Sequence, residues 1–248
     1  MSDAKMLALD IETAPHLGYF FDTFKPVIGF QQVIEPGRMI AFSAQKYGEK
    51  KVRFHSEYHD GREAMLDELD NLLQDTDIVV HYNGKRFDMP YIRGEFIAEH
   101  RTPPPPPLQI DLFQAVRANS RWASRKLDYV SQRLLEDRKV EHTGFQMWLD
   151  CLRGDEDTKR KGWALMKRYA IKDTRLLFPL FEELRPWLKM PHPITDNPNA
   201  CHQCGSTDLQ RRGVRKTAYS EYPRFRCNSC GTWLRGTTRT PITDLRPL

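Results

Sequence analysis

Two closely spaced cysteine pairs constrain the fold of this chain more than any other feature. Cys201 and Cys204 form one pair, Cys227 and Cys230 form the other, and a glycine follows each pair. Two thiolates on a tight turn, repeated once, supply the four ligands of a tetrahedral Zn²⁺ ion. Two disulfides are the alternative, which an intracellular chain disfavours. The spacing therefore predicts a structural zinc ribbon and leaves Cys151 as an ordinary thiol.

The segment around the cysteine pairs also carries the excess positive charge. Residues 196–248 hold nine Lys/Arg and four Asp/Glu, whereas residues 1–195 hold 29 of each. A solvated basic tail or a protein-docking ribbon would have this composition, but basic residues interleaved with aromatics favour nucleic-acid binding. The candidate contacts are Arg211, Arg212, Arg215, Lys216, Tyr219, Tyr222, Arg224, Phe225 and Arg226.

The longer N-terminal part reads as an α/β domain. Short apolar runs predict strands, and apolar residues at helical spacing predict helices between and after them. A mixed central sheet flanked by helices is the expected architecture. We expect strands near 6–9, 39–47, 51–58, 77–81 and 108–111, and helices over 61–74, 86–100 and most of 112–188. The predicted domains are 1–189 and 200–248, joined by a proline-containing linker, 190–199.

Length and hydropathy exclude a membrane protein. The apolar runs of this 248-residue chain fall far short of the roughly 20 residues that span a bilayer. The N-terminal residues include an acid by Asp10 and lack the apolar region and cleavage site of a secretory signal. We therefore expect a soluble, cytoplasmic protein with no membrane partner.

Four acids stand out by their positions on the predicted elements. Asp10 and Glu12 end the first strand two residues apart and so share one face. Asp88 follows the strand near 77–81, and Asp173 lies one helical turn after Tyr169. Each acid alone has an ordinary explanation as a cap or a solvated charge. Convergent carboxylates, however, are the ligands that hard divalent ions require.

Three of these segments resemble the motifs of DEDD-superfamily 3′–5′ exonucleases. They are LALDIET (7–13), HYNGKRFDMPYI (81–92) and YAIKD (169–173), and KLDYVSQRLL (126–135) resembles the intervening helix. The second motif is closest to the proofreading domain of family B DNA polymerases. Tyr169 indicates the DEDDy branch, because the other branch would have histidine where Arg168 stands.

The resemblance implies a ribonuclease H-like fold and two-metal hydrolysis of phosphodiesters from a 3′ end. It assigns two Mg²⁺ or Mn²⁺ ions to Asp10, Glu12, Asp88 and Asp173, and water orientation to Tyr169. It implies that Asn83, Phe87 and the backbone near Thr13 lie beside the terminal nucleotides. Core packing is the alternative for Phe87. The aromatic segment near 20–30 has no clear counterpart and would form either a base-stacking lip or part of the core.

The resemblance favours DNA over RNA as the nucleic-acid partner, because the second motif is polymerase-like. An exoribonuclease of the same mechanism is the nearest alternative. A structure-specific nuclease and an inactive nucleic-acid-binding adaptor also stay open. A protein partner of the zinc ribbon is a further alternative.

Overall fold

The chain divides into two compact units. The computed structural model describes residues 4–21, 27–137, 143–191 and 193–243. Residues 5–180 form one unit, and the chain from residue 181 onward forms the bulk of the other. The division falls within the long helix α6 (Glu156–Leu184). The predicted linker at 190–199, and the domain limits that depend on it, stay predictions.

A five-stranded mixed sheet forms the centre of the first unit, in the strand order β5-β4-β1-β6-β7. Strand β1 pairs in parallel with β6, which pairs in parallel with β7, and β4 is antiparallel to both β1 and β5. The strands are β1 (Met6–Thr13), β4 (Met39–Lys46), β5 (Arg53–Ser56), β6 (Ile78–His81) and β7 (Leu108–Asp111). This confirms the predicted mixed α/β architecture.

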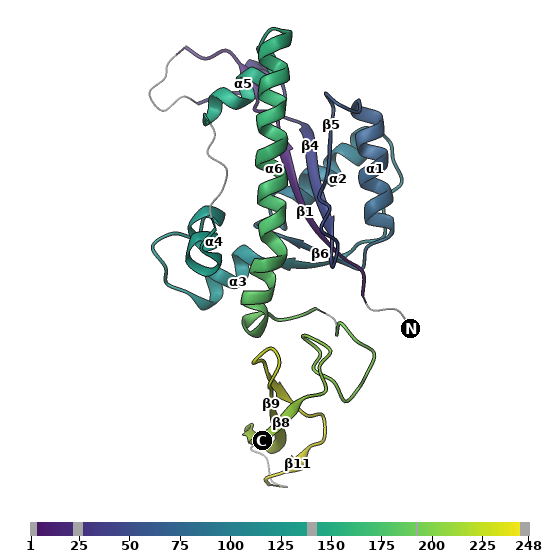
Figure 1. The fold of residues 1–248 in the computed structure, drawn as a ribbon, viewed down its shortest axis with the longest axis vertical. Helices are drawn as coiled ribbons and strands as arrows, with labels where there is room; N and C mark the ends of the chain where they lie inside the picture. The colour runs from purple at the N-terminus through teal and green to yellow at the C-terminus, as the bar shows by residue number, and fades with distance from the viewer. Residues whose placement is uncertain (1–3, 22–26, 138–142, 192, 244–248) are drawn as a thin grey trace. The chain divides into compact units, whose positions relative to one another are not determined.

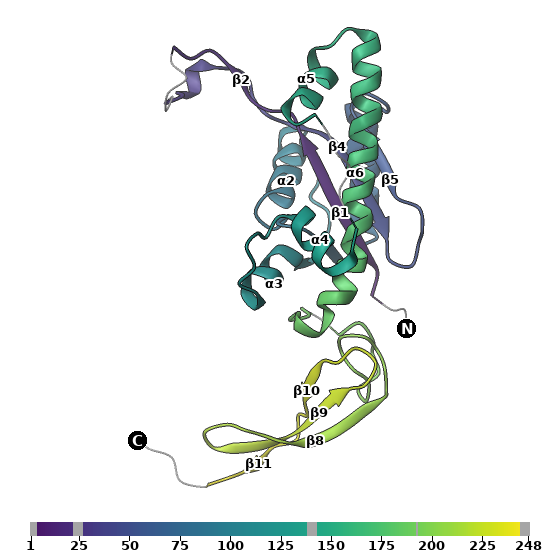
Figure 2. The same cartoon turned by 60° about the vertical axis from the view of Figure 1, so that its left-hand side comes forward.

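Helices cover both faces of this sheet (Figures 1 and 2). Helices α1 (Arg62–Gln74) and α2 (Asp88–Ala98) pack on one face, and α6 runs along the other. The described residues between β7 and α6 form three shorter helices. These are α3 (Leu112–Asn119), α4 (Leu127–Leu135) and α5 (Phe145–Arg153).

The alternation of side chains along β1 decides where its acids point. Leu7, Leu9 and Ile11 belong to the core that packs against α1 and α2. Successive side chains of a strand point to opposite faces, so Asp10 and Glu12 face α6. Helix α6 packs directly against this face, because the Ser43 hydroxyl on β4 donates a hydrogen bond to the Ala170 carbonyl of α6 at 3.0 Å. The sheet thus directs both acids toward the helix that carries Tyr169 and Asp173.

The segment after β1 leaves the sheet as a small arm. Strands β2 (Leu17–Gly18) and β3 (Val33–Glu35) pair in an antiparallel manner, with a 3₁₀ turn at Phe30–Gln32 before β3. Its described aromatic residues are exposed: Tyr19, Phe20, Phe21 and Phe30. The alternative that these aromatics fold into the core is therefore wrong, whereas Phe24 lies outside the described residues.

The second unit is a small antiparallel sheet held around the cysteine pairs. Its central strand β9 (Ser220–Cys227) pairs with β8 (Leu209–Lys216), β10 (Trp233–Arg235) and β11 (Thr240–Pro241). Before the cysteines, a 3₁₀ turn spans Arg185–Trp187. In the part of the chain that the structure describes, no helix is long and apolar enough to cross a membrane.

Candidate functional site

A cleft of about 870 Å³ opens where β1, the β6–α2 turn, the loop before α4 and helix α6 meet. Its volume lies within the range of about 300–1,000 Å³ that ligand sites usually have. Seven of the residues predicted for catalysis or substrate contact line this one cleft: Asp10, Glu12, Asn83, Phe87, Asp88, Tyr169 and Asp173. Residues from segments far apart in the sequence therefore converge as the motifs predict.

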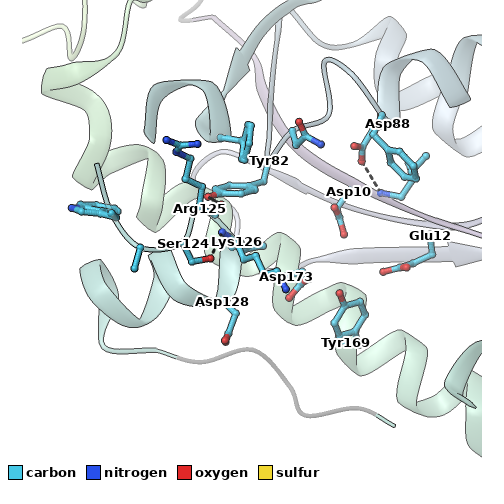
Figure 3. Close-up of a pocket in the computed structure, with 17 residues that line it drawn as sticks. Asp10, Glu12, Tyr82, Asp88, Ser124, Arg125, Lys126, Asp128, Tyr169 and Asp173 are labelled. Carbon is cyan, nitrogen blue, oxygen red and sulfur yellow. Dashed lines mark hydrogen bonds between the residues drawn. The ribbon is translucent and has the colours of Figure 1, made fainter. Parts of the chain in front are cut away.

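Three of the carboxylates are removed from water although they lie near one another. Glu12, Asp88 and Asp173 are 7%, 4% and 3% exposed, and Asp10 is half-buried. Figure 3 shows Asp10 and Glu12 on the strand opposite Asp173 and Tyr169 on the helix, with Asp88 above them. Clustered, desolvated carboxylates repel one another, and cations between them relieve that repulsion. The arrangement therefore favours bound cations.

The effect of this burial is most direct in the pKa of the Asp88 carboxyl. Burial raises its pKa to about 7, and the nearby charge of Asp111 adds to the increase. The backbone N–H of Ile11 donates to Asp88 Oδ1 at 3.1 Å and opposes the shift. A divalent cation would favour the ionised form. Hard oxygen donors of this kind suit Mg²⁺ or Mn²⁺.

Tyr169 shares the environment of these acids. Burial raises the pKa of its phenol well above the usual value, and the charges of Asp173, Glu12 and Asp10 raise it further. The hydroxyl therefore keeps its proton near neutral pH and acts as a hydrogen-bond donor, and a hydrogen bond with Asp173 is among the causes of the raised pKa. The side chain also packs against the core cluster that contains Met166.

A hydrogen-bond network behind the cleft shapes the turn that carries Asn83. Asn83 has a positive φ of 66°, and its N–H donates to Asp111 Oδ1 at 2.9 Å. The Gly84 N–H donates to Nδ1 of the buried His81 at 3.1 Å. A Cβ on residue 84 would lie 2.6 Å from the His81 ring, so glycine is required there. The side chains of His81 and Asp111, which end β6 and β7, thus hold the turn between β6 and α2 in place.

Two predicted contact residues have distinct surroundings. Phe87 is 41% exposed and lies beside Tyr91, with ring centroids 4.9 Å apart. It is therefore not a core residue. Thr13 is not part of the cleft lining, and its carbonyl accepts a hydrogen bond from the Trp148 indole at 3.0 Å. The predicted base contact near Thr13 stays a prediction.

The opposite wall of the cleft was not anticipated from the sequence. It comes mainly from the end of β6, from α3 and from the segment before and at the start of α4. Its residues are Tyr82, Phe113, Trp122, Ala123, Ser124, Arg125, Lys126, Leu127 and Asp128. Lys126 opens the KLDYVSQRLL segment, which was a usable signal, but loop residues such as Trp122 and Arg125 carry no spacing pattern.

The four predicted zinc ligands converge in the second unit. The sulfur atoms of Cys201 and Cys230 lie 3.7 Å apart, and those of Cys204 and Cys227 lie 3.6 Å apart. All four lie within 4.8 Å of one another, the one group of this kind among the described residues. Ligands about 2.3 Å from a tetrahedral zinc ion would be about 3.8 Å apart. The cluster therefore fits a zinc ribbon.

Strand register sorts the predicted contacts of the ribbon onto two faces. Residues that pair directly across β9 share a face. One face has Arg215 paired with Tyr222, Arg235 with Arg224, and Trp233 with Arg226. Two arginines stack on aromatic rings of this face. The Arg224 guanidinium carbon lies 5.0 Å from the centroid of the Trp233 ring, and the Arg235 guanidinium carbon lies 4.3 Å from the centroid of the Tyr222 ring. We call this set the arginine face.

The other face carries the remaining basic residues of the paired strands. Arg211 pairs with Phe225, and Lys216 pairs with Glu221. The Lys216 ammonium lies 3.2 Å from the Glu221 carboxylate, which offsets its charge. Arg212 lies in the irregular part of β8, where its carbonyl accepts a bond from Arg224, and Tyr219 precedes β9. Trp233 and Arg235, which follow the second cysteine pair, were not among the contacts predicted from the sequence.

Comparison with known proteins supports the ribonuclease H-like architecture. The model of the RNase_H superfamily matches residues 34–185. Among solved structures, the family B DNA polymerase from the hyperthermophilic archaeon Pyrobaculum calidifontis is similar, with a TM-score of 0.54 and 13% identity. The match covers 88% of this chain and 32% of the polymerase, so the chain spans about a third of it. No curated protein matches the chain.

Proposed function

The chain belongs to the RNase_H superfamily, and on that basis we propose that it is a metal-dependent 3′–5′ exonuclease. The observation that carries this proposal is the convergence of Asp10, Glu12, Asp88, Tyr169 and Asp173 in one cleft. Superfamily membership supports nuclease chemistry in general. The direction of attack and the two-metal mechanism rest on the motif pattern and on the acidity of the cleft.

In the proposed mechanism, the four carboxylates would hold two divalent ions, and the other residues of the cleft orient the reactants. Bound ions of this kind neutralise the phosphodiester and acidify the attacking water. The protonated Tyr169 hydroxyl donates a hydrogen bond that orients that water. Asn83 and the exposed ring of Phe87 contact the terminal nucleotides, and no covalent enzyme intermediate is needed.

DNA is the proposed substrate, supported by the polymerase-like second motif and by the similarity to a DNA polymerase. Digestion of 3′- and 5′-labelled DNA and RNA strands, single and double, with Mg²⁺ or Mn²⁺ tests this. We expect immediate loss of a 3′ label, progressive shortening of 5′-labelled strands, and faster cleavage of DNA. Internal cleavage would indicate a structure-specific nuclease, and binding without cleavage an inactive adaptor. Faster cleavage of RNA would indicate an exoribonuclease.

We expect the substitution Tyr169→Phe to slow hydrolysis by about 10²- to 10⁴-fold, because it removes only the hydroxyl that orients water. The carboxylates stay in place, so Mn²⁺ binding should match that of the wild type. Single-turnover rates and Mn²⁺ titration by electron paramagnetic resonance would measure both quantities. A wild-type rate would show that the hydroxyl is dispensable, and loss of Mn²⁺ would give the tyrosine a different role.

We further propose that the ribbon binds one Zn²⁺ ion and that it binds nucleic acid through the arginine face. Stacking on Tyr222 and Trp233 holds two of its guanidinium groups in place. The side chains that register places on this face include no carboxylate. Arginine fits phosphate geometry and stacks on bases, so such a face suits a polynucleotide of any sequence.

The two faces of the ribbon provide a matched test. We expect the double variant Arg224→Gln/Arg226→Gln to bind long single-stranded DNA more weakly and with a shallower salt dependence. The slope should fall by about 0.7 for each phosphate that the variant no longer neutralises. The variant Arg211→Gln/Lys216→Gln loses the same charge from the other face and should change both quantities much less. Fluorescence anisotropy at several salt concentrations measures them, and equal effects of the two variants would contradict the proposal.

A further inference from the structure

The wall of the cleft that faces the acids carries basic residues and aromatic rings, together with one carboxylate, Asp128. Arg125 and Lys126 lie on it together with Trp122. Figure 3 shows Ser124, Arg125 and Lys126 across the cleft from Asp10, with Tyr82 beside Arg125. Arg133 of α4 lies 5.3 Å from the centroid of the Trp122 ring, which supports the ring from behind the loop. One cleft thus has an acidic end and a basic end.

Two smaller hollows adjoin this basic end. One shares Asn83 and Phe113 with the cleft, and the other shares Arg125 with it. They also share Arg117 with each other, so the three hollows are contiguous around helix α3. Four arginines line the two hollows, with no carboxylate among the lining residues: Arg86, Arg117, Arg121 and Arg125.

The described residues offer these four arginines no carboxylate partner. Within the described part of the chain, none of them lies within ion-pair distance of a carboxylate. Several other arginines of the first unit are paired, as Arg38 is with Glu57 at 2.6 Å. Guanidinium groups gathered without counter-charges attract an anion.

Arg125 gives the most specific indication of a ligand. Its Nε is buried and has no hydrogen-bond partner among the described residues. The main chain at this residue is held, because the Tyr82 hydroxyl donates to the Arg125 carbonyl at 2.5 Å. A buried charged donor without an acceptor is costly, so such a group usually marks a missing partner. Arg125, which lines the cleft, therefore has a donor for which the described residues supply no acceptor.

We propose that these arginines bind the phosphodiester backbone of a single polynucleotide strand, with Arg125 as the central phosphate ligand. Arginine forms paired hydrogen bonds with phosphate oxygens. The aromatic rings of Tyr82, Phe113 and Trp122 line the same cleft and suit stacking on bases. The inference rests on the proposed function in one respect: the 3′ end lies at the acids, and the rest of the strand follows the arginines around α3.

The test compares Arg125→Gln with Arg160→Gln in the full chain. Arg160 is an exposed arginine near the start of α6 that pairs with Asp157, and it lies outside the cleft lining. Binding of a fluorescein-labelled oligothymidylate is measured by anisotropy with Ca²⁺ in place of Mg²⁺, at several salt concentrations. We expect Arg125→Gln to weaken binding by about 10- to 100-fold and its salt slope to fall by about 0.7. Arg160→Gln should resemble the wild type.

A third variant separates a phosphate ligand from a residue that only supports the fold. Arg125→Lys keeps the charge but loses the planar fork, so we expect it to restore the salt slope and only part of the affinity. Thermal unfolding midpoints should stay equal for all variants. A lowered midpoint with an unchanged salt slope would overturn the proposal, as would wild-type binding by Arg125→Gln.

The outcome is independent of that of the proposed function. Release of nucleotides from a 3′-labelled strand by the wild type tests the exonuclease. Binding that depends on Arg125 without any such release would overturn the exonuclease proposal and retain the strand path. If the wild type releases nucleotides but Arg125→Gln binds the strand as tightly as the wild type does, the exonuclease proposal is retained and the strand path is overturned.

Discussion

Replacement of Asp10 or Asp173 with asparagine is expected to reduce hydrolysis by about 10³-fold or more. Each change keeps the size of the side chain but removes a negative charge from the cluster in which the proposed ions bind. Ions in such a site contribute several kcal/mol of transition-state stabilisation, which corresponds to this loss of rate. The measurement is single-turnover release of the 3′-terminal nucleotide.

These substitutions should not reduce the stability of the fold. Asp173 is buried among other acids, so its neutralisation relieves repulsion, and the thermal unfolding midpoint should stay equal or rise. Asp157→Asn is the matched control, because Asp157 lies on the same helix, is exposed and pairs with Arg160 and Lys161. Retained activity in Asp10→Asn or Asp173→Asn would remove the basis of the proposed mechanism.

The sheet and the acid cluster were predictable because a simple periodicity governs both. Leu7, Leu9 and Ile11 alternate with Asp10 and Glu12, so burial of one set dictates the direction of the other. The helical spacing of Tyr169 and Asp173 works in the same way on α6. These residues then converge in one cleft because β1 lies beside α6, an arrangement that the motif resemblance implied.

The basic wall of the cleft was not predictable, since nothing local distinguishes Arg125 from the other basic residues of the chain. Its significance comes from a buried Nε that has no hydrogen-bond partner in the part of the chain that the structure describes, which only the packing of the loop before α4 reveals. Likewise, the sequence near Phe20 and Phe21 shows apolar side chains but not which way they face. In the structure both follow β2 and are exposed.

In the ribbon, the cysteine spacing predicted the four-cysteine cluster but not the two faces of the sheet. A register shift between Arg211 and Val214 sets which basic residues share a face with Tyr222. Single-residue shifts of this kind exchange the faces of a strand. The assignment of Trp233 to the arginine face likewise depends on the pairing of β10 with β9.

Loss of a single cysteine ligand should unfold the ribbon, because the ribbon has little else to hold it. From residue 189 to residue 243, the buried hydrophobic side chains among the described residues are Cys201 and Cys227 themselves. Structural zinc contributes about 10–16 kcal/mol in comparable small modules, far more than such a segment can gain from packing. We therefore expect Cys204→Ser to abolish stoichiometric zinc binding.

Cys151→Ser provides the control for this change, since Cys151 is buried beneath α6 and lies outside the cluster. It should keep one zinc ion per chain by elemental analysis, whereas Cys204→Ser should keep none and become sensitive to protease after residue 200. Both variants should still hydrolyse short strands, because the acids lie in the other unit. Only Cys204→Ser should lose affinity for long strands, since unfolding disperses the arginine face. A ribbon that stays protected without zinc would show that side-chain packing, rather than the ion, maintains this sheet.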